Sequence, residues 1–296
     1  MKYRIVELLK CPDHPESMLR ITGVQVSDVF PYPGTLPSPV CRSGCGFLGN
    51  WFTEIPDSLP PHHRLDCRRC LGIDIEQGEL VCPKCDWRLS ITDGILNTGD
   101  GGLCVPFKPE VGLKKRAAAQ VDKLLSPQRG ELVLEFETLP ETLVESWCSS
   151  GIEQIQVRCN EESIQDSRAR SCARGFCTIY QFNGPLRLEF LRREILDAVI
   201  VRVPTLDILD FDTSIGNLLS RLKPSGHALL IYKRGKSDRG NLSDRHESIL
   251  ENLPDVFRKF RTSLTEAYGF YFLHVEQPEP VEGFVVHKID AYRESD

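Results

Sequence analysis

Two cysteine pairs in the first third of the chain have the spacing of a metal site. Cys67 and Cys70 form one C-x-x-C pair, Cys82 and Cys85 form a second, and eleven residues separate the two pairs. Each C-x-x-C turn can direct two thiolates at one tetrahedral centre, and a segment of hairpin length can fold the second pair onto the first. We therefore expect one zinc ion bound by these four thiolates. Four protein ligands leave no open position, so this zinc would be structural and would contribute folding free energy on the order of 10 kcal/mol.

A second zinc site is predicted nearby, from two further pairs at short spacing: Cys11 with His14, and Cys41 with Cys45. An internal repeat supports it. The segment CPDHPESMLRITG (11–23) aligns with CPKCDWRLSITDG (82–94) through Cys-Pro, Leu and Ile-Thr, with one residue inserted. The alignment places His14 at the position of Cys85, so a common ligand type occupies the place of a predicted ligand. We expect two zinc ions in all.

The composition indicates a reducing, cytoplasmic protein. No run approaches the roughly 18 uncharged apolar residues that a membrane span needs, and the first residues, MKYRIVELLKCP, mix charges with apolar residues, unlike a signal peptide. In the cytoplasm, closely spaced cysteines indicate metal or redox chemistry rather than disulfides. Seven of the twelve cysteines fall within residues 11–85. The other five are expected to be packing residues or free thiols: Cys104, Cys148, Cys159, Cys172 and Cys177.

The charge disfavours general binding to nucleic acid. The net charge is −6, and residues 1–100 hold ten Lys and Arg against thirteen Asp and Glu. Nucleic-acid-binding domains are usually basic because neutralising phosphates drives their affinity. The local runs His62-His63-Arg64 and Arg68-Arg69 are more typical of a solvated face. The expected partner is therefore a protein, with nucleic acid disfavoured and no membrane contact.

The chain divides into three regions. Residues 1–98 predict a β-rich zinc module, residues 99–112 a linker, and residues 113–296 a domain of alternating strands and helices. Strands are expected at 131–136, 152–159, 176–182, 196–204 and 227–234, and helices at 112–125, 140–151, 213–226 and about 245–268. A closing hairpin is expected from strands at 269–277 and 282–290. This order predicts an α/β fold, a doubly wound, mostly parallel sheet with one antiparallel strand.

The ends of the zinc module resemble a known domain. LLKCP near the start and LVCPKCDWRLSITDGIL at the end are similar to the zinc ribbon at the front of some bacterial methyltransferases. A free-standing form of that ribbon is the small activator subunit of tRNA, rRNA and protein methyltransferases. The resemblance covers roughly residues 5–98, with an enlarged insertion at about 24–66 that is not typical of the ribbon.

The second domain resembles the class I S-adenosylmethionine-dependent methyltransferases. LDAVIV is similar to the family's fourth strand, LLSRLKPSGHALLIYKRG to its helix, Lys-Pro-x-Gly and strand signature, and GFYFLHVE with EGFVVHKI to its closing hairpin. The resemblance implies a Rossmann-like methyltransferase-type sheet and a cofactor site after the first strand.

The residues expected at that cofactor site depart from the family pattern. The family's glycine-rich turn lets backbone approach the cofactor, but here VLEF is followed by Glu137, Thr138, Leu139 and Pro140. Glu135 matches a family acid, whereas the end of the second strand offers Asn160 in place of the acid that holds the ribose. If S-adenosylmethionine binds, the resemblance assigns it Glu135, Glu137 and Asn160. Because these glycines are absent, we favour the interpretation that the domain is a Rossmann-like scaffold that no longer binds the cofactor in the ordinary way.

Three functions follow from these observations. The first is a non-catalytic, methyltransferase-like zinc protein, a pseudoenzyme with no catalytic residue, acting as an accessory, activating or scaffolding partner of another macromolecule. The second is an active methyltransferase with a divergent cofactor site. The third is an RNA-binding zinc module on an inert domain. The chain contains no P-loop, G-x-S-x-G or H-E-x-x-H motif that would point to other chemistry.

Overall fold

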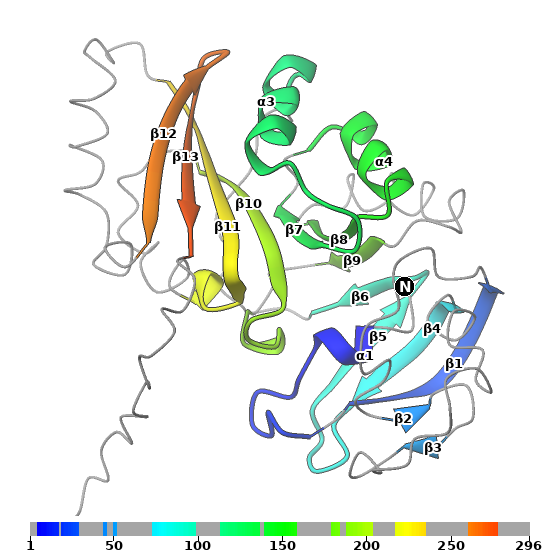
Figure 1. Ribbon diagram of the computed structural model, residues 1–296. Helices are drawn as coiled ribbons and strands as arrows, with labels where there is room; N and C mark the ends of the chain where they lie inside the picture. The colour runs from blue at the N-terminus through cyan, green and yellow to red at the C-terminus, as the bar shows by residue number, and fades with distance from the viewer. Residues whose placement is uncertain are drawn as a thin grey trace, which may run out of the picture.

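The computed structural model describes two groups of elements that meet in one sheet (Figure 1). The described part of the chain comprises residues 5–17, 19–29, 44–45, 50–51, 73–98, 113–136, 139–158, 179–183, 188–203, 217–234 and 260–277.

The carboxyl-terminal group is built around parallel strands. Its elements are α3 (Lys115–Leu125), β7 (Leu132–Phe136), α4 (Glu141–Ser149), β8 (Glu153–Arg158), β9 (Ile179–Asn183), the 3-10 turn η2 (Leu188–Phe190), β10 (Leu196–Val203), β11 (Leu222–Lys233), β12 (Arg261–Ala267) and β13 (Phe270–Glu276). Neighbouring strands in the order β9-β8-β7-β10-β11 pair in parallel. Strands β7 and β10 are nearly continuous runs of buried residues, as expected where both faces of a parallel sheet are covered.

An antiparallel hairpin completes this part of the sheet. Strand β13 lies between β11 and β12 and runs antiparallel to both. Tyr268 and Gly269 join the two hairpin strands, and their φ angles of 54° and 80° suit a two-residue hairpin turn. The predicted fold class, an α/β fold with a sheet of mostly parallel strands, an antiparallel addition and a β-rich N-terminal part, is confirmed.

Residues 261–267 differ from the sequence expectation. The sequence predicts the end of a helix there, whereas the structure has strand β12, paired with β13 along its whole length. Two of its residues, Thr262 and Thr265, are β-branched and favour a strand, and the ladder with β13 satisfies the backbone. The closing hairpin is therefore β12–β13. The strand predicted at 282–290 lies outside the described residues.

Two hydrophobic clusters cover the two faces of the sheet. Helices α3 and α4 lie on one face of the sheet (Figure 1). They pack there through buried side chains that include Val121, Val144 and Trp147. The indole Nε1 of Trp147 donates to Asp122 Oδ1 at 2.6 Å and ties the two helices together. The other cluster joins residues of both groups, and it contains Leu9, Leu80 and Leu96 together with Leu134, Leu191 and Leu230.

The N-terminal group is an antiparallel β-sheet with one short helix. Its elements are α1 (Ile5–Leu8), β1 (Arg20–Val29), β4 (Ile73–Val81), β5 (Arg88–Thr92) and β6 (Ile95–Asn97), with β2 (Gly44–Cys45) and β3 (Asn50–Trp51) in a separate two-stranded pair. Strands β1, β4, β5 and β6 are antiparallel neighbours in that order. Asp93 and Gly94, with φ of 51° and 73°, form the tight turn between β5 and β6.

Strand β6 joins the two groups into one sheet of eleven strands. It pairs in parallel with β9, from Ile95 opposite Gln181 to Asn97 opposite Asn183. Figure 1 shows the cyan β6 continuing the sheet beside β9. The N-terminal sheet therefore covers an edge that the parallel sheet would otherwise leave open.

A second contact joins the groups next to α1. Leu9 forms an antiparallel bridge with Leu191, while Lys10 N donates to Phe190 O at 2.7 Å and Arg192 N donates to Leu8 O at 3.0 Å. Together with the shared cluster of apolar side chains, these bonds hold the N-terminal group against the segment that leads into β10.

None of the helices within the described ranges combines the length and apolar character needed to cross a membrane. The predicted linker, residues 99–112, lies outside those ranges.

Gly226 in β11 is predicted to be intolerant of any side chain. A Cβ there would lie 2.8 Å from the Lys223 carbonyl oxygen and 3.2 Å from that of Leu196. We expect Gly226→Ala to lower the free energy of unfolding by about 1–3 kcal/mol in urea denaturation, because the clash is with backbone. Gly269→Asn is the control, since its Cβ would meet nothing within 4 Å and Asn tolerates positive φ. Equal losses in both variants would contradict this interpretation.

Candidate metal centre

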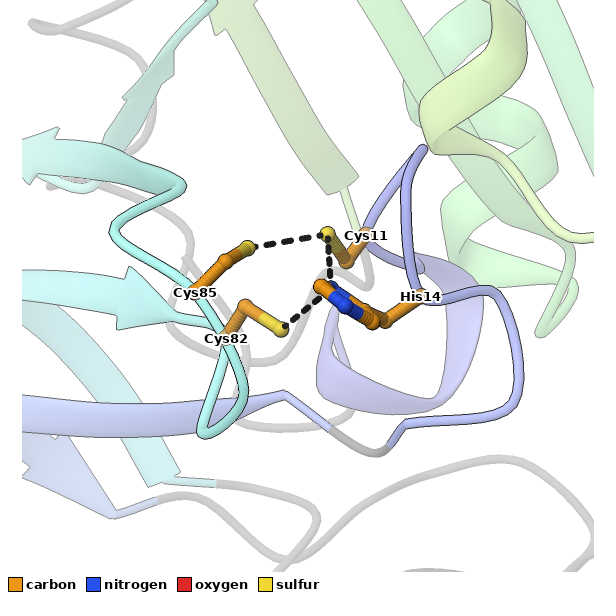
Figure 2. Close-up of side chains that lie close together, drawn as sticks. All are labelled: Cys11, His14, Cys82 and Cys85. Carbon is orange, nitrogen blue, oxygen red and sulfur yellow. Dashed lines mark hydrogen bonds between the residues drawn. The ribbon is translucent and has the colours of Figure 1, made fainter.

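Four donor side chains converge between two turns of the N-terminal group (Figure 2). Cys11 and His14 lie in the segment after α1, which we call the first knuckle, and Cys82 and Cys85 lie in the turn between β4 and β5, the second knuckle. Their ligand atoms all lie within 4.8 Å of one another. Cys11 and Cys82 are buried, whereas His14 and Cys85 are partly exposed. This group is able to hold a metal ion.

The distances within the group fit a tetrahedral ion. Cys11 Sγ lies 3.6 Å from Cys85 Sγ and 3.8 Å from His14 Nδ1. Cys82 Sγ also lies 3.8 Å from His14 Nδ1. Around zinc, with metal–sulfur bonds of about 2.3 Å and metal–nitrogen bonds of about 2.0 Å, tetrahedral ligand atoms lie roughly 3.5–3.8 Å apart. The donors therefore need little movement to bind such an ion.

Backbone hydrogen bonds hold each knuckle in shape. In the second knuckle, Lys84 N donates to Cys82 Sγ at 3.4 Å, and Cys82 N donates to Trp87 O at 3.0 Å. In the first, Ser17 N donates to His14 O at 2.9 Å. These bonds close a turn in each knuckle, so that both ligands of a knuckle face the same point.

Two side-chain contacts accompany the cluster. Lys84 Nζ pairs with Glu16 Oε1 at 2.7 Å across the two knuckles, and this hydrogen bond lowers the pKa of Glu16. Both side chains are largely exposed, so the pair adds little stability. Trp87 packs edge-on against Phe190, with ring centroids 5.2 Å apart, and so links the second knuckle to the carboxyl-terminal group.

The electrostatics of the cluster favour an added cation. Burial raises the pKa of Cys11 to about 11. Burial also opposes ionisation of Cys82, but the Lys84 amide and the neighbouring thiols donate to its sulfur, and the net effect lowers its pKa. Without a metal, Cys82 therefore ionises more readily than Cys11, which keeps its proton to higher pH. A metal ion would displace that proton and balance the charge of the thiolates.

The ligands are grouped differently from the sequence expectation. The structure brings together Cys11 and His14 from one predicted site and Cys82 and Cys85 from the other. Cys41, Cys67 and Cys70 lie outside the described residues, and Cys45 is on β2, where only the backbone is described.

The internal repeat was the signal for the observed grouping. It aligns Cys11 and His14 with Cys82 and Cys85, and two copies of one knuckle can close on a single ion from opposite sides. Sequence distance concealed this grouping. Cys67 and Cys70 end eleven residues before Cys82, so the short spacing assigns them to its site, whereas Cys11 and His14 lie about seventy residues before Cys82 and Cys85. The β1–β4 pairing removes that distance, because Arg20 lies opposite Val81.

The donor set can hold an ion but leaves it no place for a substrate. Three sulfurs and one imidazole nitrogen complete a tetrahedral shell. The chemistry of the site is therefore cross-linking of two chain segments rather than activation of water.

Of the three predicted cofactor residues, the structure describes Glu135, near the carboxyl end of β7. Glu135 is on β7 and fully buried, and its Oε2 accepts a hydrogen bond from Leu139 N at 3.4 Å. Leu139 is buried against the cluster beneath α3 and α4. Glu137 and Asn160 lie outside the described residues.

Comparisons with known proteins find similarity of fold only. No family model and no curated protein matches the chain. Among solved structures, phosphoethanolamine N-methyltransferase 2 of Haemonchus contortus has a TM-score of 0.43 at 11% identity over 56% of this chain, which spans 53% of that enzyme's chain. A SAM-dependent methyltransferase of Aquifex aeolicus has a TM-score of 0.41 at 14% identity, covering 54% of this chain and 88% of that one. A SAM-dependent O-methyltransferase of Thermotoga maritima has a TM-score of 0.42 at 12% identity, covering 58% and 69%.

The grouping of ligands makes a prediction about metal content. If Cys11 and Cys82 share one ion, Cys11→Ser, Cys82→Ser and the double variant should each lose the same single equivalent of zinc relative to wild type, measured by mass spectrometry of the purified protein. Cys148→Ser, in α4, is the control and should keep the full content. A double variant that loses one equivalent more than either single variant would show that the two cysteines bind different ions.

The pKa of Cys11 predicts how the metal-free protein responds to alkaline pH. The folded state favours the protonated thiol, so this contribution to stability is complete below the ordinary pKa of 9.0 and is lost as pH rises towards about 11. Over that interval, we expect the stability advantage of metal-free wild type over metal-free Cys11→Ser to shrink by up to roughly 3 kcal/mol in urea denaturation. An advantage that stays constant or grows with pH would contradict the assigned direction.

Proposed function

We propose that the chain is a zinc-binding, methyltransferase-like protein that acts as a non-catalytic accessory, activating or scaffolding partner of another protein in the cytoplasm. The observation that carries this proposal is the turn after β7. A doubly wound sheet binds its ligand outside the carboxyl ends of the strands, at the point where the strand order reverses. Here that point lies beside β7, which has β8 on one side and β10 on the other.

The turn after β7 supports loss of ordinary cofactor binding. A glycine-rich turn offers bare backbone N–H groups to a ligand. In this chain the Leu139 N–H is directed to the carboxylate of Glu135, and the Leu139 side chain is anchored in the core. An amide that donates to the protein's own carboxylate is not available to a cofactor.

The metal centre supports a structural role for zinc. Its four donors come from two knuckles that lie at one end of the β1–β4 ladder, so the ion would cross-link the segment before β1 to the turn between β4 and β5. We propose zinc because three thiolates and an imidazole are a donor set that suits this ion. A reducing compartment would keep these thiols available.

Two zinc ions per chain remain our proposal. With one set assigned to Cys11, His14, Cys82 and Cys85, the short-spaced cysteines left for a second ion are Cys41, Cys45, Cys67 and Cys70. The spacing of these residues is the support for the second ion.

The edge of the N-terminal sheet is the surface that we propose for the partner. Strand β1 is the last strand of the eleven in the described sheet, and its second edge has no strand paired with it in those residues. Val24 and Val26 on this strand are 42% and 51% exposed. An extended segment of a partner protein could add to such an edge through main-chain hydrogen bonds, with the two valines as apolar contacts.

An active methyltransferase is the second candidate. Glu135 at the end of β7 favours it, because the family that the sequence resembles often has an acid at this position. The third candidate is an RNA-binding zinc module on an inert domain. The acidic charge of the first hundred residues disfavours it.

Calorimetric titration with S-adenosylmethionine and S-adenosylhomocysteine separates the first two candidates. We expect no binding at micromolar concentrations to the zinc-loaded protein, because the turn after β7 offers no glycine backbone. Glu135→Gln is the matched variant: it keeps the size of the side chain and should leave the result unchanged. Wild-type binding with a micromolar dissociation constant, together with weaker binding by Glu135→Gln, would establish the cofactor site and overturn the proposal.

A further inference from the structure

Four basic side chains gather where the N-terminal group meets the segment leading into β10. We call Lys10, Arg192, Arg193 and Arg221 the junction cluster. Lys10 follows the first α-helix and directly precedes the metal ligand Cys11, Arg192 and Arg193 lie between η2 and β10, and Arg221 directly precedes β11.

Backbone hydrogen bonds bring these three segments together. Arg192 N donates to Leu8 O, and Lys10 N donates to Phe190 O, so residues 8–10 and 190–192 run side by side. The amides of Ile195 and Leu196 both donate to the Arg221 carbonyl oxygen at 2.9 Å. The cluster is therefore assembled by the fold, from positions about 10, 190 and 220 in the sequence.

Arg221 has an environment that is unusual for a cation. It is 5% exposed, and its Nε and Nη1 atoms are shielded from solvent with no hydrogen-bond partner in the described residues. Leaving guanidinium donors buried and unbonded costs folding free energy, because the groups lose their water without replacement. Such a site is explained if the donors serve a ligand.

Arg221 lies near other positive charges, which repel it. Burial, followed by repulsion from Arg193, lowers the pKa of Arg221, while Glu189 acts in the opposite direction. Lys10 lies close enough to all three arginines of the cluster to be repelled by each of them. Glu189, which is exposed, is the carboxylate that acts on Arg221, so the basic side chains around Arg221 outnumber the acidic ones.

We propose that the junction cluster binds a phosphate group. A phosphate carries up to two negative charges and several acceptor oxygens, and it can take hydrogen bonds from more than one guanidinium at once. It would neutralise the excess positive charge and satisfy the buried donors of Arg221. A single carboxylate has fewer acceptor oxygens to share among three guanidinium groups and one ammonium.

This site is separate from the cofactor position. The junction cluster lies at the amino ends of β10 and β11, whereas a doubly wound sheet binds its cofactor at the carboxyl ends. It lies instead beside the metal centre, through Lys10. The inference therefore does not depend on whether S-adenosylmethionine binds. The phosphate could be free, or it could belong to the backbone of an RNA strand, and the experiment distinguishes the two sources.

The test titrates zinc-loaded, full-length protein with inorganic phosphate and, separately, with a single-stranded RNA oligonucleotide. Ionic strength is held constant with chloride, and binding is followed by calorimetry and by the thermal midpoint. We expect saturable binding to wild type and at least about tenfold weaker binding to Arg193→Gln and Arg221→Met, because each variant removes a charge-assisted donor. Binding of RNA that inorganic phosphate displaces only weakly would identify a nucleic-acid source. Binding of phosphate alone would identify a free anion.

Controls separate binding from folding. Arg116→Gln removes an exposed arginine of α3, which packs with the hydrophobic cluster on the other face of the sheet, and should bind like wild type. Arg221→Met should raise the thermal midpoint in phosphate-free buffer while losing the phosphate-dependent increase, since it removes a buried, unbonded charge. If Arg221→Met does not fold, the exposed Arg193 keeps the test available. No phosphate-specific binding by wild type to either probe, or unchanged affinity in Arg193→Gln, would overturn the proposal.

Discussion

The parallel pairing of β6 with β9 is the interaction on which the rest of the structure depends. Three residue pairs convert two small sheets into one of eleven strands and place the N-terminal group on the edge that β9 would otherwise expose. Once the edge is paired, α1 comes to lie beside the segment before β10, and apolar side chains of both groups enter one cluster. The N-terminal group has one four-residue helix in its described part, so burial shared with its neighbour supplies stability that a sheet without covering helices could not obtain alone.

The metal centre follows from the same arrangement. Its two knuckles are held in register by the β1–β4 ladder, and each presents two ligands to the other. Cross-linking by a metal is most effective where chain segments have few other contacts, because the ion then replaces the apolar burial that the segments lack. The exposed Lys84–Glu16 pair also spans the knuckles, but solvent screens it, so it adds little to the ladder and the four donors.

The two ends of the parallel strands offer different chemistry, although they belong to one sheet. At the carboxyl end, the turn after β7 directs its Leu139 amide to the protein's own Glu135. At the amino end, the buried guanidinium of Arg221 lies among other cations. Fold alone assigns neither a substrate nor an activity. The groups that could act are those whose hydrogen-bonding capacity the fold itself leaves unused.

The sequence by itself determined the local chemistry and the order of the elements. Buried apolar runs marked β7, β10 and β11, and the cysteine spacing together with the repeat marked the knuckles, because these are properties of neighbouring residues. It did not identify β12, since the helical pattern at 261–267 competes with a strand that is stable only when β13 lies beside it. The repeat relates Cys11 and His14 to Cys82 and Cys85, but tertiary structure decided that the two pairs meet at one point, and it alone decided the β6–β9 pairing and the gathering of Lys10 with Arg221. Each depends on contacts between segments far apart in the chain, and such contacts leave no fixed spacing in a sequence.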